Sequence, residues 1–190
     1  MYEQHDFFKH RLDELTSEIQ ISRPEDQAGN LDTSFGVRLQ LYHAAIIIFL
    51  DNPFVGAGPQ GFALQMQPMQ AAGIITPMAA AMGRGEVHND ILSKAAGMGL
   101  PGLIAILALY AVPFRLFWKV SNSRFREVRR AGLLGITFVS AIAIFGLTVE
   151  FLNLTMAAAF YAFTVAVLLA ASNAISREAM KSKFNEKEEL

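Results

Sequence analysis

One histidine and its charged neighbours are the side chains of this sequence best suited to chemistry on a charged substrate. His88 follows Arg84 and Glu86 in the segment GRGEVHND, just ahead of an expected helix start at Asn89-Asp90. Imidazole is the side chain best suited to accept a proton near neutral pH. Nearby guanidinium groups favour the neutral, proton-accepting form of the ring. We therefore expect His88 to act as a general base.

Arginines supply the second part of the expected site. Arg38 lies in an otherwise apolar segment, where a guanidinium group extends to an interface, pairs with a carboxylate or binds phosphate through two parallel charge-assisted bonds. Arg84, between two glycines, could bind phosphate in the same way, or it is a solvated loop arginine. We expect catalytic roles for His88 and Arg38, substrate binding by Arg84 and Asn89, and neither a metal ion nor a cofactor.

Two other functional patterns are present but incomplete. The segment GAGPQG, residues 56–61, matches the dinucleotide-binding fingerprint in its letters, yet residues 71–85 contain no acid and the preceding segment looks helical. We expect these glycines to make a tight turn or a close backbone approach. A zinc site built from Glu86, His88 and Asp90 is disfavoured, because the alternating spacing suits a strand and offers only one imidazole.

The composition indicates a membrane protein with a polar first half. Apolar residues make up 53% of the 190 residues and charged residues 17%. Residues 1–97 carry 6 basic and 11 acidic side chains, whereas residues 98–190 carry 10 basic and 6 acidic ones. There is no cysteine, which excludes disulfides, thiolate metal sites and a cysteine nucleophile. Because no signal peptide precedes residues 1–97, we expect the chain to be the C-terminal part of a longer protein.

Short helices should position the polar residues. Apolar spacing predicts helices over residues 6–21 and 35–50, the second too short to cross a membrane and therefore lying along the interface or against a bundle. Residues 62–81 suit short helices with a connector. Asn89 or Asp90 should cap a helix that runs to about Met98, where glycines break it.

Three strongly apolar stretches follow, each long enough to cross a membrane. We expect spans over residues 100–118, 131–149 and 154–171, each reaching about 27–28 Å. The loop 119–130 between the first two spans is rich in Lys and Arg, so the positive-inside rule makes it cytoplasmic. Residues 1–97 and the turn at Glu150 then lie outside, in the periplasm of a Gram-negative cell, and the C-terminal tail is cytoplasmic. Glu150 either orients a partner or only marks that turn, and we favour the second interpretation.

The ordered set of motifs resembles the C-terminal part of the O-antigen ligase and O-antigen polymerase superfamily. The resemblance consists of an arginine-bearing helix (Arg38), a turn of the pattern Asn-Pro-Phe-x-Gly-x-Gly-x-x-Gly-Phe (residues 52–62), His88-Asn89 before a helix, and Gly-x-x-Gly (residues 99–102). It covers about residues 34–118. It implies an all-α, polytopic membrane protein fragment in which residues 1–97 form a periplasmic helical loop region and residues 98–190 form three transmembrane helices with a cytoplasmic tail.

The resemblance also implies an activity. It implies a metal-independent glycosyltransferase that moves a glycan from undecaprenyl diphosphate to an acceptor such as a second glycan or the lipid A core. No nucleic acid takes part in such a reaction. His88 matches the histidine that activates the acceptor hydroxyl, and Arg38 an arginine that binds the diphosphate. The sequence departs at Ile91, where the family often has tyrosine, and another family arginine comes from an earlier part of the loop. We therefore expect the chain alone to lack a complete site.

Two other classes of function stay open on the sequence. One is a non-catalytic membrane protein or transporter fragment that binds lipid-linked glycan in contact with membrane lipids. The other is a polymerase or a protein O-oligosaccharyltransferase of the same superfamily, with a different acceptor.

Overall fold

The computed structural model describes residues 31–188, with side chains described through residue 181. The helix expected over residues 6–21 lies outside this range. Every regular element in the described part of the chain is helical, which confirms the all-α prediction. The elements are α2 (Ser34–Asp51), α3 (Gly61–Ala71), α4 (Pro77–Gly83), α5 (Asp90–Ser121), α6 (Arg126–Phe145), the short 3-10 helix η1 (Phe151–Asn153) and α7 (Thr155–Glu188).

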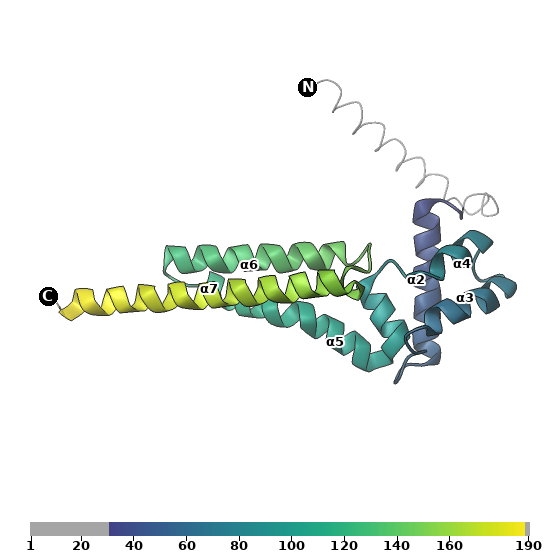
Figure 1. Ribbon diagram of the computed structural model, residues 1–190, viewed down its shortest axis with the longest axis horizontal. Helices are drawn as coiled ribbons and strands as arrows, with labels where there is room; N and C mark the ends of the chain where they lie inside the picture. Colours follow the sequence, from purple (N-terminus) through teal and green to yellow (C-terminus); the bar gives the residue numbers. More distant parts are fainter. Residues whose placement is uncertain (1–30, 189–190) are drawn as a thin grey trace, which may run out of the picture.

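The helices form two groups that meet at the start of α5. Helices α5, α6 and α7 lie side by side as an elongated bundle, and α2, α3 and α4 pack together at one end of it (Figure 1). Helix α2 runs across the direction of the bundle and contacts α5 (Figure 1). This placement confirms that the 35–50 helix packs on the bundle.

The small helical group has its own apolar core. Val37, Leu41 and Ile48 line one side of α2 and pack against Met66 of α3 and residues 79–80 of α4. Thr33 and Thr76 begin α2 and α4, since each hydroxyl oxygen accepts from a backbone N–H of the first turn. The core gives α2 a fixed position over the end of the bundle.

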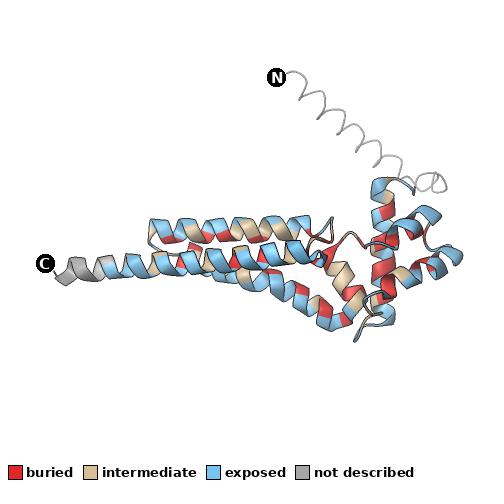
Figure 2. Ribbon diagram, in the orientation of Figure 1, coloured by how far each residue is buried: buried red, intermediate tan, exposed pale blue. Residues whose placement is uncertain are grey.

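Within residues 31–188, three helices are long and apolar enough to cross a membrane: Asp90–Ser121, Arg126–Phe145 and Thr155–Lys181. Most residues on the outside of this bundle are exposed (Figure 2), and many of them have large apolar side chains, as a lipid-facing surface requires. Inside, α5 and α6 approach closely at glycines, because a Cβ at Gly132 or Gly135 would overlap Ser121 or the Phe117 ring. The expectation of three apolar spanning helices is therefore confirmed.

The boundaries of the last two spans differ from those expected. Helix α6 ends at Phe145 rather than Val149, with Gly146 at its C-cap, so residues 146–149 belong to the loop. Helix α6 also begins at Arg126, which places most of the basic cluster on its first turns instead of in a loop. Helix α7 continues past residue 171 to Glu188, since no proline or glycine interrupts residues 155–188.

The basic turn and the polar residues of interest lie at opposite ends of the bundle. The turn between α5 and α6 lies at the end far from α2, whereas the loop between α6 and α7 lies beside α2 and the start of α5 (Figure 1). The 20 residues of α6 separate these two ends by about 30 Å.

Candidate active site

The glycine-rich turn after α2 binds to a break in α5. At Gly99 the backbone leaves the helical conformation, with φ 64° and ψ −150°, which leaves carbonyl and amide groups of α5 without helical partners. The turn supplies those partners through three backbone hydrogen bonds: Ala57 to the Ala96 carbonyl at 2.8 Å, Gly58 to the Gly97 carbonyl at 2.9 Å, and Leu100 to the Pro53 carbonyl at 2.7 Å.

This contact explains why the two motifs carry glycine. A Cβ on Gly56 would lie 2.4 Å from the Gly97 carbonyl carbon, and a Cβ on Gly99 would lie 2.6 Å from the Pro53 oxygen. Both glycines also have positive φ, which other L-residues rarely adopt. The expectation of a close backbone approach is confirmed, and the dinucleotide interpretation fails because a helix, not a strand, precedes the turn.

His88 lies just before Asn89, the N-cap of α5, in an unusual conformation. Its φ is 61°, the left-handed region, and it is the one non-glycine residue with positive φ in the described part of the chain. Its Nδ1 lies 3.3 Å from Oε1 of Glu86. The direct partner of the ring is thus a carboxylate, where the sequence suggested guanidinium groups. A carboxylate that accepts from Nδ1–H leaves Nε2 as the nitrogen able to accept a proton.

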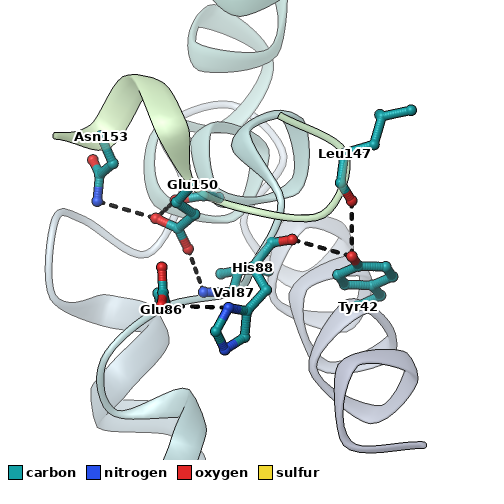
Figure 3. Close-up of polar contacts among 8 residues, drawn as sticks. Tyr42, Glu86, Val87, His88, Leu147, Glu150 and Asn153 are labelled. Atoms are coloured by element: carbon teal, nitrogen blue, oxygen red, sulfur yellow. Dashed lines mark hydrogen bonds and ion pairs between the residues drawn. The ribbon is translucent and has the colours of Figure 1, made fainter. Parts of the chain in front are cut away.

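Glu150, from the loop between α6 and α7, reaches the backbone just before His88. Its carboxylate accepts from the Val87 N–H, from the Ser93 hydroxyl at 3.0 Å and from the Asn153 amide at 3.0 Å (Figure 3). Only 4% of Glu150 is exposed. This burial raises the pKa of Glu150, and the hydrogen bonds from Val87 and Ser93 oppose that rise. The interpretation of Glu150 as a mere turn marker is wrong, since it links that loop to the histidine segment.

Tyr42 of α2 holds the other side of the same segment. Its hydroxyl lies 3.1 Å from the His88 carbonyl oxygen and 2.8 Å from the Leu147 carbonyl oxygen, so it joins three parts of the chain (Figure 3). The backbone N–H of Asp90 donates to the Gly146 carbonyl at 2.8 Å, and the Asp90 carboxylate accepts from the Leu152 N–H at 3.0 Å. The start of α5 is therefore attached to the loop 146–154.

Asn89 caps α5 as expected. Its side-chain oxygen accepts from Ile91 N–H at 2.9 Å and Leu92 N–H at 3.0 Å, and its amide donates to the Leu147 carbonyl at 3.1 Å. Asn89 is buried, and its side-chain oxygen and amide group both have hydrogen-bond partners within the protein. The contacts give Asn89 a structural part in the site, and its role in substrate binding stays a prediction.

The two arginines lie at the same end of the bundle as His88. Arg38 is exposed on α2, one helical turn or about 6 Å from Tyr42 and on the same face. Arg84 is exposed at the end of α4, two residues before Glu86. Both arginines are exposed and lie on elements at the same end of the bundle as the histidine segment.

Comparison with known proteins bears on this arrangement. A family model described as O-antigen ligase matches residues 6–107, which is more than half of the chain. The chain belongs to the O-antigen ligase family. An uncharacterized protein of Haemophilus influenzae is 26% identical over 117 residues, a match that covers 60% of this chain. The match spans 28% of that relative's length.

The O-antigen ligase match contains the glycine-rich turn, His88 and the first half of α5, but it ends before Glu150. The sequence patterns predicted Arg38, His88 and Asn89 inside that range but not Tyr42, which also lies inside it, and they favoured Glu150 as a marker of the turn. One signal did exist for Glu150: it is the one acidic residue between residues 128 and 177, in a turn between two apolar spans. Burying a carboxylate is unfavourable without hydrogen-bond partners, so an acid in that position suggests a specific contact.

Proposed function

We propose that this chain is the C-terminal part of a membrane glycosyltransferase of the O-antigen ligase type. It moves a glycan from an undecaprenyl diphosphate carrier to a sugar hydroxyl on the acceptor, on the periplasmic side of the inner membrane. The observation that carries the proposal is the Glu86–His88 pair at the mouth of an apolar bundle, at the same end as Arg38. Family membership supports glycosyl transfer at a membrane.

In this proposal His88 activates the acceptor. The acceptor hydroxyl oxygen attacks the anomeric carbon of the donor while its proton moves to Nε2 of His88. The bond between the anomeric carbon and the diphosphate oxygen breaks, and the electron pair leaves with the diphosphate. Glu86, 3.3 Å from Nδ1, stabilises the positive charge that develops on the ring.

The arginines stabilise the leaving group. A diphosphate departs readily once its charge is neutralised, and the planar guanidinium group suits two oxygens of a phosphate. Arg38 is the main residue that binds the diphosphate, and Arg84 and Asn89 contribute to substrate binding. The described residues hold no group of three or more His, Cys, Asp or Glu side chains that could bind a metal ion. We propose a reaction that needs neither a metal ion nor a cofactor.

Replacing His88 by alanine in the full-length protein tests this proposal. We expect glycan transfer to fall by at least about 100-fold, the usual contribution of a general base, with normal expression. His43, exposed on α2, is the control, and His43→Ala should retain activity. Transfer that persists in His88→Ala would favour a non-catalytic protein that binds lipid-linked glycan. Supplying lipid A core, free glycan or a protein as acceptor distinguishes a ligase from a polymerase or a protein-modifying enzyme.

A further inference from the structure

The backbone of His88 needs external support. A non-glycine residue in the left-handed region is strained, because Cβ crowds the neighbouring carbonyl oxygen. Such strain persists only where surrounding contacts hold it in place. With φ at 61°, His88 is such a residue, and it lies between two buried positions, Val87 and Asn89.

Contacts from two different elements hold the backbone close to His88, at the Val87 N–H on one side and at its own carbonyl group on the other. On the N-terminal side, the Val87 N–H donates to Glu150, whose carboxylate also accepts from Ser93 and Asn153. On the C-terminal side, the Tyr42 hydroxyl lies 3.1 Å from the His88 carbonyl oxygen and 2.8 Å from the Leu147 carbonyl oxygen, and the two carbonyl groups share its one proton. Because one contact comes from the α6–α7 loop and the other from α2, the histidine conformation depends on how these elements pack.

The supported conformation sets the direction of the ring. Figure 3 shows the imidazole on the side of the backbone away from Leu147 and Glu150, next to Glu86. A rotation of φ to negative values would move the ring relative to Glu86. A base must lie within hydrogen-bond distance of the proton that it accepts, so such a movement would separate the ring from its substrate.

We propose that Glu150 and Tyr42 are positioning residues, which hold His88 in its left-handed conformation and thereby direct its ring. This inference rests on the proposed function of His88 as the base. It goes further, because it assigns a part in the reaction to a loop outside the matched family region. Neither residue touches the reacting atoms; both act through the backbone of His88.

Three variants of the full-length protein test the inference by kinetics. Glu150→Ala removes the carboxylate, Glu150→Gln keeps one oxygen that can accept from Val87, and Tyr42→Phe removes only the hydroxyl. We expect kcat to fall about 100-fold in Glu150→Ala, since a base misplaced by about 1 Å loses that much, and about 10-fold in Tyr42→Phe. Glu150→Gln should recover part of the loss, and KM for the donor should change little.

Thr148→Ala is the matched control in the same loop, because the Thr148 side chain is exposed and bonds only within the turn, to Phe145. In a His88→Ala background, Glu150→Ala should cause no further loss of activity. A purely structural role would lower the melting temperature or the yield and leave kcat of the folded enzyme unchanged, which would overturn the inference.

Amide hydrogen exchange provides a readout that does not depend on activity. The amides of residues 87–90 should exchange faster in Glu150→Ala and Tyr42→Phe than in the wild type. Their exchange rate should be unchanged in Thr148→Ala. A wild-type protein that transfers no glycan would refute the proposed function, while the exchange result would still decide whether these residues hold the segment. Unchanged exchange in both variants would refute the positioning role itself.

Discussion

At the scale of single residues, the site depends on buried polar groups that support one another. Glu150 is a carboxylate in a place where few water molecules reach, and three donors from Val87, Ser93 and Asn153 satisfy it. Removing one partner of such a group leaves the other without a hydrogen bond, which is costly. The loop that contains Glu150 is therefore under a strong local constraint.

The raised pKa of Glu150 predicts how stability depends on pH. Burial is the main cause, and the neighbouring Glu86 adds to it. Folding that raises the pKa of a carboxyl group favours its protonated form. The contribution of Glu150 to the stability of the folded protein is therefore most favourable below its ordinary pKa of 4.5, and it declines as the pH rises toward the raised pKa. Glutamine does not titrate. The melting temperature of the wild type minus that of Glu150→Gln should thus decrease as pH rises.

Thermal unfolding of the two proteins in detergent, from pH 4 upwards, measures this difference. Thr148→Ala serves as the comparison, because it leaves the carboxylate unchanged. A difference that stays constant across the range, or that increases with pH, would contradict the direction of the shift.

Sequence patterns could predict some of these residues and not others. His88 and Asn89 lie in a recognisable order before a helix start, so local spacing was enough to predict a cap and a candidate base. The contact of Tyr42 with His88 joins residues 46 apart, and that of Glu150 with Val87 joins residues 63 apart. Periodicity along one helix contains no information about such distant partners, so these contacts required the fold.

At the scale of elements, the junction between the glycine-rich turn and α5 is the feature that fixes the site. It predicts opposite effects for two glycines that are two positions apart. Gly99→Ala should destabilise the protein by about 2 kcal/mol, because it combines a left-handed backbone with overlap against the Pro53 oxygen. Gly97→Ala should be neutral or slightly stabilising, since its Cβ would lie an ordinary 3.7 Å from the Gly58 oxygen.

Thermal unfolding and expression level of the two variants check this prediction. Equal tolerance of both substitutions would show that α5 can straighten at Gly99 without cost. It would also show that the break at Gly99 is not needed for the three backbone hydrogen bonds between the turn and the helix.

Element types were easier to predict than element ends. The apolar stretches of residues 100–118, 131–149 and 154–171 predicted three membrane helices, because burial in lipid requires a long apolar surface. Their ends depend on contacts instead. Helix α6 ends at Phe145, and the Gly146 carbonyl that follows accepts from the Asp90 N–H; no pattern in residues 146–149 indicates that partner.

At the scale of the whole molecule, the chain has a basic end and a site end. The basic side chains gather at the α5–α6 turn: Lys119, Arg124, Arg126, Arg129 and Arg130. The positive-inside rule assigns that end to the cytoplasm, which would put the site in the periplasm. These 190 residues contain no cysteine, so a cysteine introduced among them reports its own location in a protein whose remaining part has also been made free of cysteine.

We expect Gln67→Cys, exposed on α3, to react with a membrane-impermeant maleimide once the outer membrane is permeabilised, in cells whose inner membrane is intact. Asn122→Cys, exposed at the α5–α6 turn, should react only after lysis. The reverse pattern would place the site in the cytoplasm and remove the periplasmic assignment from the proposed function.

The attachment of His88 to the α6–α7 loop has a consequence for biosynthesis. Val87 and Glu150 are separated by 63 positions, so the ribosome makes the histidine segment well before the residue that supports it. The polar groups at the entrance to α5 obtain their partners only after α6 has been inserted and the chain has turned back. The conformation of His88 in a nascent chain would thus lack this support until the α6–α7 loop has been made and has folded back against the start of α5.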